Sequence, residues 1–132
     1  MNRSGIFPFV FALILMSFTD IVQAQEKTER FILIEAPCQP TFPAPPSGKD
    51  KVIITKVFKV QYDSPFELVS AEPELITRFE VALQKAYPGS RNLVKDILVY
   101  MLVTEKEARE LYNRKQKQFK LMEIAVIELK TE

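Results

Sequence analysis

The sequence predicts a small single-domain α/β (α+β) protein, with a sheet of three to four strands and two helices in the order β-β-α-β-α-β. Short segments rich in β-branched and aromatic residues predict the strands. Two longer segments, in which apolar residues recur every three or four positions, predict the helices. Proline and glycine separate these segments, as expected of turns.

The N-terminal residues 1–24 are typical of a secretory signal peptide. Arg3 supplies a positive charge, Ile6 to Phe18 is an apolar run, and Val22-Gln23-Ala24 is a cleavage site before Gln25. The sequence therefore predicts an exported protein, periplasmic or secreted. A retained anchor is the alternative, and it is the only membrane contact that we expect. A spanning helix needs about 20 apolar residues, and this run is shorter.

Residues 25–50 are predicted to be a polar N-terminus, a short strand and a proline-rich connector. We expect residues 25–30 to be disordered and the apolar run Phe31–Ile34 to be a short strand at the edge of the sheet. Prolines at 37, 40, 43, 45 and 46 predict an extended, polyproline-II-like connector. Phe42, between these prolines, is expected to dock onto the core.

The α/β domain is predicted over residues 51–132. Val52 to Tyr62 is rich in β-branched and aromatic residues and predicts one strand. Its two lysines, Lys56 and Lys59, favour a less buried position in the sheet. A helix follows, with Ser70 as its N-cap, and ends at Pro88-Gly89.

The remaining segments predict a strand, a helix and a last strand. Ile97–Val103 is apolar throughout, which is typical of a strand buried on both faces, although a helix is the alternative. Thr104 and Glu107 match a capping box that begins a helix running to about Gln118. Phe119–Leu129 is the last strand. Ile97–Val103 and Ile124–Ile127 are the most apolar segments, so we expect these two strands at the centre of the sheet.

Composition excludes most catalytic and metal chemistry. The chain has no histidine, one cysteine and three glycines. This rules out histidine-based nucleophilic centres, histidine- or thiolate-ligated metals and glycine-rich phosphate loops. The net charge of +1 gives no general attraction to nucleic acid. We therefore expect no enzyme activity, no cofactor and no metal site.

The lone cysteine, Cys38, lies among prolines and has no partner for an intramolecular disulfide. It is predicted to be either an inert thiol or half of a bridge to another chain. A basic stretch contains Arg114, Lys115 and Lys117. Cations at a helix C-terminus complement the helix dipole, which explains this stretch, and an anionic partner is the alternative.

Four carboxylates, Asp63, Glu67, Glu72 and Glu74, lie close together in the sequence. Solvated loop charges are the simplest interpretation. The alternatives are a hard-cation site or the acid/base pair of a hydrolase that uses carboxylates alone.

An exposed sheet face is the feature that favours a function. If both helices cover one face, the other exposes Ile53 and Val57 unless the proline-rich arm with Phe42 covers it. We therefore expect a non-enzymatic domain that binds another protein or self-associates, as a homodimer, through a sheet face or edge. A small-ligand or lipid-binding envelope protein, with a pocket between helices and sheet, is an alternative. The candidate interaction residues are Cys38, Phe42, Ile53, Val57, Arg114, Lys115 and Lys117.

Overall fold

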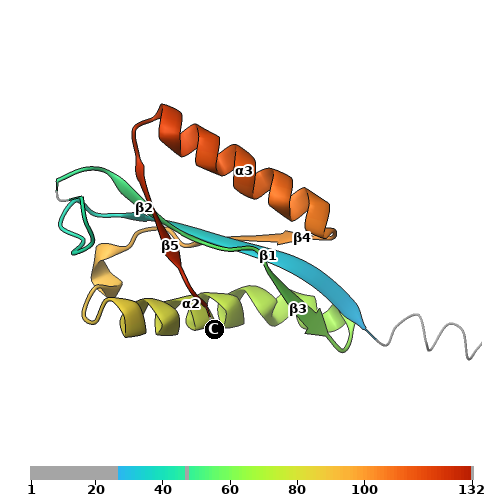
Figure 1. Cartoon of the computed structure of the whole chain (residues 1–132). Coiled ribbons are helices and arrows are strands. Elements are labelled where there is room, and N and C mark those ends of the chain that lie inside the picture. The colour runs from blue at the N-terminus through green and yellow to red at the C-terminus, as the bar shows by residue number, and fades with distance from the viewer. Residues whose placement is uncertain (1–26, 47, 132) are drawn as a thin grey trace, which may run out of the picture.

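The computed structural model describes residues 27–46 and 48–131, which form three layers with the sheet between two long helices (Figure 1). Helix α2 (Ala71–Ala86) covers one face of the sheet and helix α3 (Glu105–Leu121) covers the other. This confirms the predicted α/β fold class. The predicted signal peptide over residues 1–24 lies outside the described residues.

The sheet is built around one long strand, β1 (Thr28–Cys38). Along one side, β1 pairs antiparallel with β2 (Lys51–Thr55) and with β3 (Phe58–Tyr62). Along its other side it pairs antiparallel with β4 (Leu98–Leu102). Strand β5 (Ala125–Leu129) pairs in parallel with β2. Strand β4 is therefore the edge on one side of the sheet, and β5 together with β3 forms the edge on the other side.

This order reverses the predicted positions of the strands. The segment Phe31–Ile34, expected at an edge, belongs to the central strand β1, whereas β4 and β5, expected at the centre, lie at the edges. The reason is that a helix lies on each face of the sheet. Apolar residues on both faces of a strand therefore report that both faces are covered, and they do not report how many strands flank it.

The predicted strand Val52–Tyr62 is two strands with a break at Lys56 and Val57. At this break the hydroxyl Oγ1 of Thr55 accepts a hydrogen bond of 3.0 Å from the backbone N–H of Ile34. Both residues are fully buried, so this bond satisfies a donor that the strand ladder would otherwise leave unpaired. Strands β2 and β3 thus follow the same side of β1 with a kink between them.

Helix α3 begins as the sequence predicts and ends later. The hydroxyl of Thr104 accepts a hydrogen bond of 3.2 Å from the backbone N–H of Glu107. The helix continues to Leu121, so β5 begins at Ala125 and not at Phe119. Phe119 lies four residues after Lys115, on the helical face that packs against the sheet, and this explains why it is buried.

The proline-rich connector forms turns and bends after β1, not the extended segment that the sequence predicts. Within it, the backbone N–H of Phe42 bonds the carbonyl of Gln39 at 3.0 Å. The ring of Phe42 packs edge-to-face on Tyr87, with ring centroids 5.0 Å apart. Phe42 is therefore docked in the core, as expected, and the connector covers one end of the α2 layer.

Two clusters of apolar side chains fill the spaces between the layers. The cluster under α2 has as its buried members Ile32, Ile34, Ala36, Phe42, Ala44, Ile53, Tyr62, Ala71, Leu75, Phe79, Leu83 and Leu129. The cluster under α3 is smaller, with Leu33, Val52, Ile54 and Phe119 as its buried members. Alternate residues of β1 contribute to opposite clusters, as the pleat of a strand requires. Residues 28–46 thus share a sheet and a core with residues 51–131.

Candidate functional site

The apolar candidates from the sequence lie inside the molecule or at the kink. Ile53 is 0% exposed and Phe42 is 2% exposed, so neither offers a surface to a partner. The helices lie on opposite faces of the sheet, so the exposed face that the sequence analysis considered does not arise. Val57 is half-buried at the break between β2 and β3.

Cys38 is half-buried on the α2 side of β1. Burial raises the pKa of its thiol to about 11, and the neighbouring Lys51 offsets only part of this effect. At neutral pH the thiol is therefore protonated, which makes it a weak nucleophile. The environment of Cys38 favours the inert thiol over the intermolecular bridge.

The basic stretch of α3 divides between the surface and the interior. Arg114 and Lys117 are exposed, whereas Lys115 turns toward the sheet. Its Nζ donates to Oε1 of Glu35 over 2.8 Å, and Glu35 is 4% exposed. Lys115 is therefore engaged within the fold, unlike its two neighbours.

Glu35, Tyr100 and Lys115, here called the polar triad, join β1, β4 and α3. The hydroxyl of Tyr100 donates to the same oxygen of Glu35 that Lys115 contacts. The ammonium of Lys115 also lies 5.1 Å from the centre of the Tyr100 ring and 5.9 Å from that of Phe119. The buried carboxylate thus has a cation and a hydroxyl as partners, and the triad fastens β4 to the centre of the sheet.

The environment keeps both donors of the triad protonated at neutral pH. Burial of Lys115 opposes its charge, but the bonds to Glu35 and Tyr100 outweigh burial and raise the pKa of Lys115. Burial, followed by the bond to Glu35, raises the pKa of Tyr100. A cluster whose donors do not titrate near neutrality is suited to a structural role.

The acidic candidates form no metal-binding group in the part of the chain that the structure describes. Oε2 of Glu67 accepts a hydrogen bond of 3.0 Å from the backbone N–H of Asp63, which closes their own turn. Glu72 and Glu74 lie in the first turn of α2, where negative charge is stabilised by the helix dipole. Local structure therefore accounts for these carboxylates.

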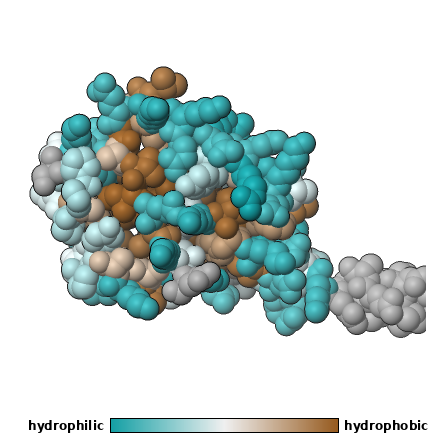
Figure 2. All heavy atoms as spheres, viewed as in Figure 1, coloured by the Kyte–Doolittle hydropathy of each residue, from teal (hydrophilic) through white to brown (hydrophobic). Residues whose placement is uncertain are grey.

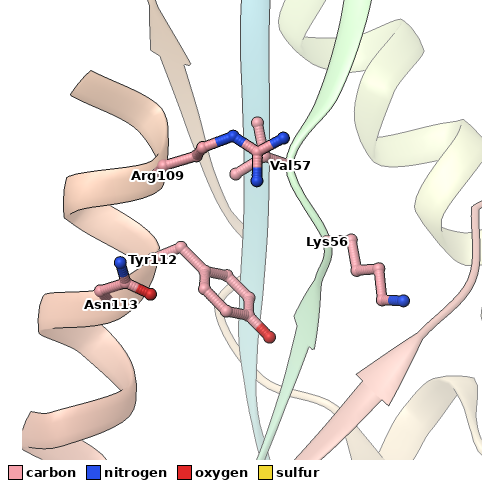
Figure 3. Close-up of a pocket in the computed structure, with 5 residues that line it drawn as sticks. All are labelled: Lys56, Val57, Arg109, Tyr112 and Asn113. Carbon is pink, nitrogen blue, oxygen red and sulfur yellow. The ribbon is translucent and has the colours of Figure 1, made fainter. Parts of the chain in front are cut away.

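A hollow of about 390 Å³ lies between α3 and the kink after β2 (Figure 3). The residues that line it are Lys56, Val57, Arg109, Tyr112 and Asn113. Its charged groups already have partners: Lys56 contacts Glu128 at 3.3 Å, and Arg109 contacts Glu105 at 2.6 Å. The Tyr112 hydroxyl also donates to Glu128, over 3.3 Å. Each charged group that lines the hollow thus has a partner within the fold.

The free edge of β4 is the most distinctive surface among the described residues. Strand β4 pairs only with β1, so the backbone groups on its outer side have no strand partner. From Ile97 to Val103 every side chain is apolar, and Leu98 and Val103 are 47% and 62% exposed. Natural edge strands are protected by lysine, proline, an inward charge, short length or a bulge. The five residues of β4 include no lysine, proline or charged residue, so only the short length of the strand and the bulge before it limit pairing at this edge.

A bulge ends this edge on one side. Glu35 pairs with Leu98 and Cys38 bridges to Val94, so the β4 side has one residue more than β1 between these two contacts. Asp96 lies within this interval, with φ of 21°. The regular part of the edge is therefore the strand itself, Leu98–Leu102, with Ile97 before it and Val103 after it.

A groove lies between α2 and the segment that leads into β4. Its apolar lining comes from Ile76 and Leu83 of α2 and from Val94 and Ile97 before β4. The remaining lining residues are Glu80, Arg91, Asn92, Lys95 and Asp96. An unpaired strand edge next to a groove with mixed apolar and polar lining can receive an added strand, whose alternate side chains enter the groove.

The opposite edge, β5, differs in its side chains. It carries Glu128, which pairs with Lys56, and Lys130 follows it. Figure 2 shows the molecule from the side of β5, where apolar side chains reach the surface and hydrophilic side chains cross between them. Charge therefore protects β5 from pairing, in contrast with β4.

Comparison of the chain with protein-family models, with curated proteins and with solved structures found no match. Among the described residues, none of the helices has the length and apolar character needed to span a membrane.

Sequence reasoning identified the apolar segment of β4 but not its position at an edge. It missed the polar triad as well, because Glu35 and Lys115 are 80 residues apart. The available signal was Glu35 itself, a charge between Ile34 and Ala36 in an apolar run. Such a charge is buried only with a partner.

Proposed function

We propose that this chain is an exported, non-enzymatic domain that binds another protein chain through the free edge of β4. The observation that carries the proposal is the strand itself: an unpaired backbone edge whose side chains are apolar on both faces. An added strand would satisfy the backbone groups and cover Leu98 and Val103.

The polar triad supports this proposal because it prepares the edge for binding. Tyr100 anchors β4 to Glu35 and, through Glu35, to α3. An edge that is already held in its bound conformation loses little conformational entropy when a partner strand adds to it. Export is supported by the N-terminal sequence, where Arg3 and the apolar run to Phe18 precede the cleavage site.

Site-specific photo-cross-linking tests the proposal in cells that produce the full chain. Leu98 is replaced by benzoylphenylalanine, and Val81 is replaced in a control variant because it is 64% exposed on α2. We expect a covalent adduct with a protein chain at position 98 and none at position 81. We also expect the recovered chain to begin at Gln25.

Absence of an adduct at position 98, or equal adducts at positions 98 and 81, would overturn the proposed binding edge. A recovered chain that begins at Met1 would overturn its export with cleavage. The mass of the adduct also distinguishes a second copy of this chain from a different protein.

A further inference from the structure

We infer that the partner at the β4 edge is a second copy of this chain, paired antiparallel about a two-fold axis at Tyr100. This inference rests on the proposed function and names its partner. The two sheets would join into one continuous sheet, with both copies of α3 on one face and both copies of α2 on the other.

The side chains of β4 are complementary to themselves in this arrangement. The axis places Leu98 opposite Leu102 of the second copy and Val99 opposite Met101 of the second copy. Directly opposed residues in antiparallel strands share a face, and each of these pairs does. Tyr100 lies opposite its own copy, so the apolar run is matched along its whole length.

The two most exposed residues of the edge also find apolar partners. Val103 lies opposite Ile97 of the second copy, and Ile97 lines the groove beside α2. Leu98, on the α3 side, meets Leu102 of the second copy. Each of these two contacts thus occurs twice in the dimer, once at each end of the symmetric interface.

The charges that flank the apolar run agree with the same direction of pairing. Lys95 and Asp96 precede the run, and Lys95 has no carboxylate within 4.0 Å among the described residues. Glu105 follows the run and already pairs with Arg109 of its own helix through one oxygen, Oε1. Antiparallel pairing brings Lys95 of one copy toward Glu105 of the other at both ends of the interface. A parallel arrangement would instead place like charges together.

Cysteine cross-linking tests the register. In full-length chains that carry Cys38→Ala, the variants Leu98→Cys and Leu102→Cys are purified separately, mixed and oxidised under mild conditions. We expect a disulfide-linked dimer in the mixture and little in either variant alone. Positions 98 and 98 of two copies lie four residues out of register, or roughly 13 Å apart along the strands.

A mixture of Val81→Cys and Leu98→Cys is the control for random collision. We expect no disulfide-linked dimer from this mixture on a non-reducing denaturing gel. Cross-linking in each variant alone would overturn the register. A sedimentation mass of one chain at all concentrations, together with no disulfide in the mixture, would overturn the second copy as partner. If the second copy is excluded in this way, a photo-cross-linked adduct with a different protein at position 98 would still support the proposed function. Absence of any adduct at position 98 would overturn both the proposed function and this inference.

Discussion

The double variant Leu98→Lys/Val103→Lys is expected to remain folded and to lose self-association. Each replaced side chain is exposed, so the fold is expected to tolerate the lysines. In the dimer each apolar contact contributes roughly 1 kcal/mol, and symmetry makes four such contacts per interface. The loss of roughly 4 kcal/mol corresponds to a dissociation constant about a thousandfold higher.

Sedimentation equilibrium measures this dissociation constant, and circular dichroism checks the fold of the variant. The matched control is Val81→Lys/Leu121→Lys, because these two apolar residues are 64% and 85% exposed but lie on the helices. The control is expected to associate like the unchanged chain. Equal weakening in both variants would mean that general hydrophobicity, and not β4, drives association.

Replacing Lys115 with methionine is expected to lower the free energy of unfolding by about 3 kcal/mol. The change leaves the carboxylate of Glu35, whose side chain is 6% exposed, without its cation. Removing one partner of a buried ion pair costs about 3–5 kcal/mol, and the lower value applies because the Lys115 side chain remains 21% exposed.

A double-mutant cycle with Glu35→Met separates the pair from the packing around it. The variant Glu35→Met/Lys115→Met is expected to recover most of the lost stability, because it removes the charge that the single change strands. Urea unfolding of the four chains at one protein concentration supplies the values. A double variant as unstable as the sum of the single changes would show that the two residues act independently.

The local sequence was sufficient for both helices and for the presence of strands, but not for all strand boundaries or for the arrangement of the strands. The capping box at Thr104 predicts the start of α3, and the structure confirms Thr104 as its N-cap. The stop at Pro88-Gly89 predicts the end of α2, which ends two residues earlier, at Ala86. Hydrogen bonds between near neighbours in the chain determine these features, so a short window of sequence contains the necessary information.

The strand order depended on contacts between distant residues. The polar residues around Phe31–Ile34 made β1 look short, yet Glu35 is buried because Lys115 neutralises it from α3. In the same way, Thr55 bridges to Ile34 at the kink and keeps β2 and β3 on one side of β1. Lys115 is 80 residues from Glu35 and Thr55 is 21 residues from Ile34, so a short stretch of sequence contains neither contact.

The candidate site was predicted in part, for a related reason. The apolar segment Ile97–Val103 reads as a central strand, and within one copy of the chain it is an edge. Pairing of two copies would make it central, so the sequence pattern and the position of β4 would then agree. The misplaced strand in the sequence analysis therefore points to the same edge as the exposed side chains do.

Hydrogen–deuterium exchange of the β4 segment is the measurement that tests most directly whether copies of the chain meet at this edge. The full chain is compared in concentrated and in dilute solution, and exchange is followed in residues 97–103 and in residues 125–129. Pairing of two copies predicts slower exchange of the β4 segment in the concentrated sample and equal exchange of the β5 segment in both samples. Exchange of the β4 segment that is fast and independent of concentration would contradict the account.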